Sequence, residues 1–185
     1  SSQIPTILLS NLTKSKVTVS LSGDGGDEIF GGYGKYFLGQ RIISTLGRLP
    51  YGLRSLIKTT RLLDNSLSKS LLHLVIGKTV TNFPQKFQKL NKIFDFKNEK
   101  DLYEKLSTFE NKFLLNNSQP LLFNKNIWSN NLSYAEKAMM QDTVDYLPGD
   151  ILRKVDLAAM STSLETRIPF LDHEIIAYAW SLPFD

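Results

Sequence analysis

Seven consecutive residues combine the side chains and the backbone freedom that chemistry most often needs: Ser22, Gly23, Asp24, Gly25, Gly26, Asp27 and Glu28. The glycines allow positive φ angles and close approach of a ligand, and the N–H groups of such a turn can form an anion-binding concavity. Mg²⁺ is usually held by one or two carboxylates together with phosphate oxygens. The stretch therefore predicts either a nucleotide and metal site or a glycine-rich turn with a solvated acidic rim. It fits neither the dinucleotide fingerprint nor the P-loop.

A second group of candidate residues, most of them charged, lies near the other end of the sequence. Arg153, Asp156 and Met160 share one face if their segment is helical, because they are three and four residues apart. Glu165 and Arg167 alternate, so both point the same way from an extended segment. These positions are a second set of candidates for a site.

The elements around the first group are expected to be a strand and a helix. Residues 17–21 are rich in β-branched side chains, which predicts a buried strand, and Asp27 and Glu28 begin a helical segment near its positive dipole end. Ligands collect beyond the carboxyl ends of strands in open α/β sheets, so the loop between the two elements is well placed for binding. Apolar periodicity predicts further helices at 4–12, from 28 to 40 with an interruption at 31–32, from 50, at 67–75, at 87–94, from 101, and at 134–146, 151–160 and 173–181.

Local signals set the expected ends of several helices. Ser133 and Glu136 form a capping box, and residues 148–149 (Pro-Gly) should stop the helix that it begins. Three aspartates are expected to cap helices: Asp101, Asp150 and Asp172. The chain is therefore mostly α-helical with one confident strand. The other strands of a parallel sheet are expected outside it.

Composition limits the class of protein. The 185 residues are 42% hydrophobic and 22% charged, which indicates one ordinary globular domain. The sequence contains no cysteine, which excludes disulfides and thiolate chemistry and fits a cytoplasmic location. The longest apolar run, 71–76, is far too short to span a membrane. Residues 35–100 hold 13 Lys/Arg against 3 Asp/Glu. A non-catalytic module that binds nucleic acid or a partner protein is therefore an alternative. The helical spacing of these cations instead favours the solvent-facing sides of helices. We therefore expect no nucleic acid or membrane partner.

Two blocks of sequence resemble glutamine-dependent asparagine synthetases. The first, Ser22-Gly-Asp-Gly-Gly-Asp-Glu-Ile-Phe-Gly-Gly-Tyr33, is similar to the second nucleotide loop of that family. The second is Tyr146-Leu-Pro-Gly-Asp-Ile-Leu-Arg-Lys-Val-Asp-Leu-Ala-Ala-Met-Ser-Thr-Ser-Leu-Glu-Thr-Arg-Ile-Pro-Phe-Leu-Asp172. The resemblance implies an α/β parent fold of the adenine-nucleotide alpha-hydrolase-like, PP-loop ATP pyrophosphatase type. Residues 1–185 would then be part of a single synthetase domain, with 37–139 as a helical insertion without a recognised motif.

The resemblance also implies a reaction. The β-carboxylate of aspartate attacks the α-phosphorus of ATP, giving β-aspartyl-AMP and pyrophosphate, and ammonia from glutamine then displaces AMP to form asparagine. ATP and Mg²⁺ are the implied cofactors. The alternative enzyme is a related amide ligase that acts on another carboxylate, such as a β-lactam-forming ligase. Asp24 disfavours it, because those ligases tend to carry an aromatic residue there.

Site residues are implied in the same way. Ser22, Gly23 and Gly25 match positions that bind the nucleotide, and Asp27 matches the metal carboxylate. Asp24 falls near the acyl-adenylate and the attacking amine, where a synthetase can carry Glu, so its shorter side chain leaves that role open.

The second block has two interpretations. Either Glu165 and Arg167 line the acyl-adenylate pocket, or they belong to an internal ion-pair network that holds this block against the loop. In both cases the helix expected at Asp150 and residues 163–169 should pack close to residues 22–28.

Parts of the family pattern are absent from this sequence. It has no cysteine nucleophile of a glutaminase domain and no Ser-Gly-Gly-x-Asp-Ser pyrophosphate loop, and it lacks the family's later lysine. We therefore expect an internal piece of a synthetase domain that binds ATP poorly and makes no amide by itself. Its expected partners are small-molecule substrates and the glutaminase domain of its parent chain, and a homodimer is compatible with the resemblance.

Overall fold

The structure, a computed structural model, describes residues 3–59, 95–110, 125–128 and 131–184. The chain divides into two compact units. The first comprises Ser1–Tyr33, Leu121–Ile127 and Met139–Asp185, and the second comprises Gly34–Pro120 and Trp128–Ala138. The helices predicted at 67–75 and 87–94 lie outside the described residues.

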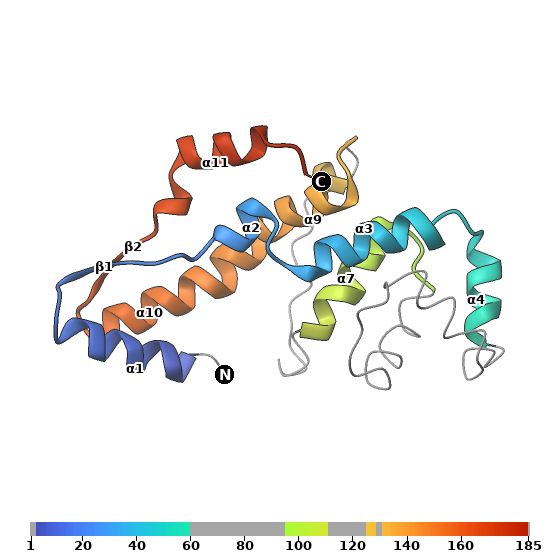
Figure 1. Cartoon of the computed structure of the whole chain (residues 1–185). Helices are drawn as coiled ribbons and strands as arrows, with labels where there is room; N and C mark the ends of the chain where they lie inside the picture. Colours follow the sequence, from blue (N-terminus) through green and yellow to red (C-terminus); the bar gives the residue numbers. More distant parts are fainter. Residues whose placement is uncertain (1–2, 60–94, 111–124, 129–130, 185) are drawn as a thin grey trace. The chain divides into compact units, whose positions relative to one another are not determined.

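The first unit combines helices with a small two-stranded sheet. Its elements are α1 (Gln3–Lys14), β1 (Val19–Leu21), α2 (Gly26–Phe30), η2 (Asp142–Leu152), α10 (Arg153–Ser161), β2 (Glu165–Arg167), η3 (Pro169–Leu171) and α11 (His173–Ser181). Helix α1 lies along α10, as Figure 1 shows, and α2 packs against both η2 and α11. The buried side chains of this unit include Ile29, Leu147 and Ala158.

The sheet consists of two parallel strands. Val19 pairs with Glu165 and Leu21 pairs with Arg167, so the carboxyl ends of β1 and β2 lie at the same edge. The sequence predicted only one strand, because three residues of Glu-Thr-Arg carry no apolar alternation. The strand predicted at 17–21 is present as β1, but the prediction that it is buried is wrong, since Val19 is 45% and Leu21 76% exposed. Two strands of three residues make too small a sheet to be covered on both faces.

Two of the predicted caps are confirmed. Asp172 precedes α11, and its Oδ1 accepts a hydrogen bond from the Glu174 N–H at 2.8 Å. In the capping box, the Ser133 N–H donates to Glu136 Oε2 at 2.8 Å, and the Glu136 N–H donates to Ser133 Oγ at 3.3 Å. This box begins α9 (Tyr134–Gln141) where the sequence predicted a helix start.

The predicted stop after α9 is wrong. The chain continues from Gln141 into η2, a π-helix that runs through Pro148 and leads directly into α10. Proline has no N–H, so Pro148 leaves one backbone bond unmade in either kind of helix, and here that gap lies within the π-helical ladder. Asp150 is therefore inside a helix and caps nothing. Its carboxylate forms an ion pair with Lys154 at 3.3 Å.

The described elements of the second unit are helices. It contains α3 (Gly34–Leu46), α4 (Tyr51–Thr59) and α7 (Glu99–Glu110), and α3 packs against α7. Two further helices, α8 (Lys125–Trp128) and α9, each carry residues of both units. Gly39 of α3 allows a close approach, because a Cβ there would lie 2.0 Å from Tyr134 Cε1. Fully buried side chains of this unit include Tyr36, Ile42 and Leu102.

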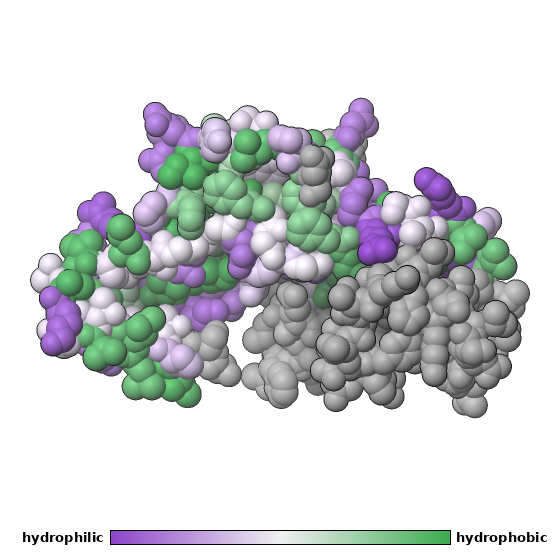
Figure 2. Space-filling model, in the orientation of Figure 1, coloured by the Kyte–Doolittle hydropathy of each residue, from purple (hydrophilic) through white to green (hydrophobic). Residues whose placement is uncertain are grey.

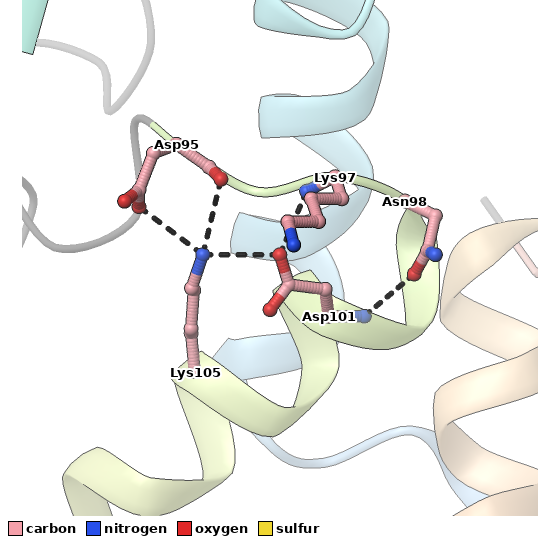
Figure 3. A network of polar contacts seen from close by, with 5 residues as sticks. All are labelled: Asp95, Lys97, Asn98, Asp101 and Lys105. Carbon is pink, nitrogen blue, oxygen red and sulfur yellow. Dashed lines mark hydrogen bonds and ion pairs between the residues drawn. The ribbon is translucent and has the colours of Figure 1, made fainter. Parts of the chain in front are cut away.

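A polar network surrounds the start of α7 (Figure 3). The Asp101 N–H donates to Asn98 Oδ1 at 2.9 Å, and the Lys97 N–H donates to Asp101 Oδ2 at 2.7 Å. Lys105 Nζ lies 3.1 Å from a carboxylate oxygen of Asp95 and 3.0 Å from one of Asp101. Asn98 therefore caps this helix, and the prediction that Asp101 is the cap is wrong by three positions. The reason is that Asn98 accepts from the third residue of the helix, as an N-cap does.

One face of α1 is apolar and exposed. Ile4, Leu8, Leu9 and Leu12 are each between 63% and 67% exposed and contribute to the apolar surface over this helix in Figure 2. Among the described residues, no helix combines the length and the apolar character that crossing a membrane requires.

Candidate functional site

The glycine-rich loop leaves β1 at the edge where both strands end. The Ser22 N–H donates to the carbonyl of Arg167 at 2.8 Å, which extends the strand pairing into the loop. Gly25 has φ +83°, so the predicted positive φ is confirmed at this position. Phe170, which follows β2, covers the loop from one side: a Cβ added to Gly26 would lie 3.2 Å from its ring.

The two carboxylates of the loop that the sequence marked as site candidates differ in their surroundings. Asp24 is half-buried, and its Oδ2 accepts a hydrogen bond from Ser22 Oγ. Asp27 lies in the first turn of α2 and is exposed. Carboxylate oxygens are the ligands that Mg²⁺ prefers, and an exposed carboxylate can share the ion with phosphate oxygens. Among the described residues no three acidic or histidine side chains gather as a metal centre, so Asp27 offers a single carboxylate that is compatible only with an ion whose other ligands come from elsewhere, such as phosphate oxygens.

The third acidic side chain, Glu28, faces inward. It is 1% exposed, and its Oε1 accepts a hydrogen bond from the Tyr33 phenol at 2.8 Å. Burial raises the pKa of Glu28, the phenol hydrogen bond opposes this, and the nearby Asp142 and Asp27 raise the pKa further. Burial and the Glu28 carboxylate also raise the pKa of Tyr33. The sequence predicted that Glu28 lies at the start of a helix, and the structure confirms this position while burying its carboxylate in the hydrogen bond to Tyr33.

The second block packs against the loop, as predicted for residues 163–169, through the bond between the Ser22 N–H and the Arg167 carbonyl. Helix η2 packs on α2, and a Cβ at Gly25 would lie 3.0 Å from Leu171 Cδ2, just after the strand that pairs with β1. Arg167 forms an ion pair with Glu165 at 2.5 Å, and the two side chains are 70% and 51% exposed. The internal ion-pair network proposed for them is therefore wrong, because a strand of three residues at the sheet edge leaves both side chains in solvent.

A cleft of about 650 Å³ lies between η2, α10 and β2. Arg153, Asp156 and Met160 all line it, so their predicted common face is confirmed. Glu165 also lines this cleft, whereas no residue of 22–28 does. Glu165 therefore lines the same cleft as Arg153 and Asp156 of α10. Arg167 contacts the loop through its backbone carbonyl, which accepts from the Ser22 N–H.

Sequence reasoning missed two residues near the loop. Tyr33 closes the turn after α2 through its bond to Glu28, and Gly32 lies against Asp27. The Gly31-Gly32 pair was the available signal, but from it the sequence indicated only an interruption of the helix at 31–32.

Comparisons with known proteins agree with the two sequence blocks. The whole chain, residues 1–185, matches the asparagine synthase family. It is 30% identical to asparagine synthetase [glutamine-hydrolyzing] 1 of Bacillus subtilis over 97% of the chain and 27% of that protein. It is 26% identical to asparagine synthetase [glutamine-hydrolyzing] 3 of the same organism, over 93% of the chain and 22% of that protein.

No solved structure matches the chain. The chain spans about a quarter of the length of the relatives that it matches, 27% and 22% for the two proteins of Bacillus subtilis. The family match nevertheless extends over every residue and includes both blocks. The chain belongs to the asparagine synthase family.

Proposed function

We propose that this chain is part of an ATP-dependent amide ligase that forms asparagine from aspartate. One observation carries the proposal: the two family blocks, far apart in sequence, meet at the carboxyl edge of one parallel sheet. The pairing of Leu21 with Arg167 places the loop at 22–28 beside the segment that follows β2. Ligands of open parallel sheets bind at this edge.

The proposed reaction has two steps. The β-carboxylate of aspartate attacks the α-phosphorus of ATP, and the bond to the pyrophosphate breaks, which yields β-aspartyl-AMP. Ammonia then attacks the acyl carbon, AMP leaves, and a proton from the amine is released. The ammonia would come from glutamine, in keeping with the names of the relatives, through a glutaminase domain of the complete protein.

The loop would bind the nucleotide through its backbone. Gly25 holds the left-handed turn of the loop, and Ser22 and Gly23 are the positions that the family resemblance assigns to the nucleotide. Ser22 also orients Asp24 through its hydroxyl group, which supports a role for Asp24 near the attacking amine. Glu165 would contribute from the cleft beside α10, and Arg167 from the same sheet edge.

Asp27 would hold the magnesium ion. When bound, Mg²⁺ would neutralise phosphate charge as two anions are brought together. The contribution of the chain is to hold the Asp27 carboxylate exposed in the first turn of α2, where an ion shared with ATP could reach it.

Pyrophosphate release by the complete protein tests this proposal. With ATP, aspartate and a Mg²⁺ titration, Asp27→Asn should slow aspartate-dependent release by more than about tenfold, because it removes an anionic ligand. Asp24→Ala should reduce amide formation more than pyrophosphate release. The exposed Asp172→Asn, in the cap of α11, is the control. An Asp27→Asn variant with the rate of the native protein would exclude the metal role.

We expect the 185-residue chain by itself to bind ATP weakly. Its sequence contains no Ser-Gly-Gly-x-Asp-Ser loop. Two or three charge-assisted hydrogen bonds lost with that loop are worth about 4 kcal/mol or more, about a thousandfold in dissociation constant. Calorimetry of the chain with Mg-ATP measures this, and low-micromolar binding would contradict it.

A further inference from the structure

A glycine, Gly32, lies against the Asp27 carboxylate. A Cβ built on Gly32 would lie 2.0 Å from Asp27 Oδ1 and 2.9 Å from Asp27 Cγ. The first distance is far below any contact between non-bonded atoms, and the second is also shorter than a real Cβ contact. The carboxylate therefore occupies the space that the first side-chain atom of any other residue at position 32 would need.

Backbone conformation does not explain the glycine at this position. Gly25 and Gly31 are the described glycines with positive φ, at +83° and +73°, and Gly32 is not among them. Alanine at position 32 would meet no conformational penalty of the left-handed region. The requirement for glycine at 32 comes from Asp27, mainly from its carboxylate and also from its Cα, which a Cβ would approach to 3.1 Å. At position 31 both the positive φ and the ring of Phe184, 2.4 Å from a Cβ there, require glycine.

The turn after α2 is built to hold this contact. The N–H groups of Gly31 and Gly32 both point to the carbonyl of Asp27, the latter at 2.9 Å. The next residue, Tyr33, donates to the buried Glu28 at 2.8 Å, and its ring lies edge-on to Tyr146 of η2 at 6.3 Å. The turn is thus attached at both ends, once to the backbone of Asp27 and once to the core of the unit.

We propose that Gly32 is a positioning residue for Asp27. The missing Cβ leaves room for the carboxylate to lie over the backbone of the turn, and this contact sets the direction in which the carboxylate presents its oxygens. The inference rests on the proposed function, in which Asp27 binds a divalent cation shared with ATP. A larger residue at position 32 displaces the carboxylate and weakens that cation's binding, although position 32 itself contributes no ligand.

The test compares two glycines that differ in one respect. Gly32→Ala adds a Cβ against Asp27, and Gly34→Ala, two residues later, adds one with nothing within 4 Å. Both are made in the complete protein, with Asp27→Asn as the reference for loss of the ligand. Binding of Mn²⁺ in the presence of ATP is measured by electron paramagnetic resonance, independently of turnover. Loss of a residue that orients a metal ligand typically lowers metal affinity about 10–100-fold. Gly32→Ala should therefore bind Mn²⁺ about 10–100-fold more weakly than the native protein, and Gly34→Ala should bind it equally well.

The outcomes separate this inference from the proposed function. If Asp27→Asn loses Mn²⁺ affinity while Gly32→Ala binds like Gly34→Ala, positioning by Gly32 is refuted and the metal role of Asp27 stands. If Asp27→Asn binds Mn²⁺ as tightly as the native protein, the metal role fails and the positioning role fails with it.

A double variant covers the case in which Gly32→Ala is too unstable to assay. In Asp27→Ala/Gly32→Ala the carboxylate that the new Cβ meets is gone. We expect this variant to regain most of the unfolding temperature that Gly32→Ala loses. A double variant as unstable as Gly32→Ala would show that the clash involves other atoms, and would overturn the inference.

Discussion

Tyr33→Phe should loosen the turn that closes α2 while leaving its packing intact. The variant removes the phenol that donates to Glu28 Oε1 at 2.8 Å, and it keeps the ring that contacts Tyr146. A hydrogen bond to a charged group contributes about 1.5–3 kcal/mol, and Glu28, at 1% exposed, has little access to water as a replacement donor. We therefore expect a loss of about 2 kcal/mol in the local free energy of opening, which is about 30-fold in the opening equilibrium.

Amide hydrogen exchange of the complete protein measures this loss where it occurs. The amides of Gly31 and Gly32 donate to the carbonyl of Asp27, so their exchange reports on opening of the turn. They should exchange about 30-fold faster in Tyr33→Phe than in the native protein. Tyr178→Phe, at a side chain that is 64% exposed, is the control and should change nothing. Unchanged protection in Tyr33→Phe would refute the role of the hydrogen bond.

The effect should depend on pH with a definite sign. Burial raises the pKa of Glu28 above its ordinary 4.5, so the contribution of this group to stability is full below 4.5 and is lost as the pH rises through the folded-state pKa. The phenol favours the ionised carboxylate and limits that loss. Tyr33→Phe should therefore cost more at about pH 8 than at about pH 4, where the carboxyl is protonated with or without the phenol. A larger cost in acid would contradict this account.

Three further predictions concern stability. Gly39→Ala should destabilise by about 1–3 kcal/mol in chemical denaturation, because its Cβ would lie 2.0 Å from Tyr134, whereas Gly52→Ala, with open space around it, should be neutral or stabilising. Asp172→Ala should cost about 1 kcal/mol in thermal unfolding through loss of the α11 cap. Burial lowers the pKa of Lys105, but its hydrogen bonds to the two aspartates in Figure 3 raise that pKa by more. The stabilising effect of Lys105 should therefore be full below the ordinary pKa of 10.5 and should be lost as the pH rises through the higher folded-state pKa. Unfolding of Lys105→Met should show no such alkaline loss.

Features that depend on a few neighbouring residues could be predicted from the sequence. The capping box at Ser133 and Glu136 and the cap at Asp172 are encoded within three residues, and the structure contains both. The positive φ of Gly25 follows from the absence of a Cβ. Family membership was visible for the same reason, since each block is a contiguous run of residues.

Features that depend on distant segments required the tertiary structure. Strand β2 exists because Glu165–Arg167 pairs with β1, and three charged and polar residues carry no periodic signal of their own. The path of the chain through Pro148 depends on a π-helix packed on α2. Of the adjacent carboxylates Asp27 and Glu28, one is exposed and the other is 1% exposed. Burial is a property of what packs against a side chain, and η2, which packs on α2, lies more than a hundred residues further along the chain.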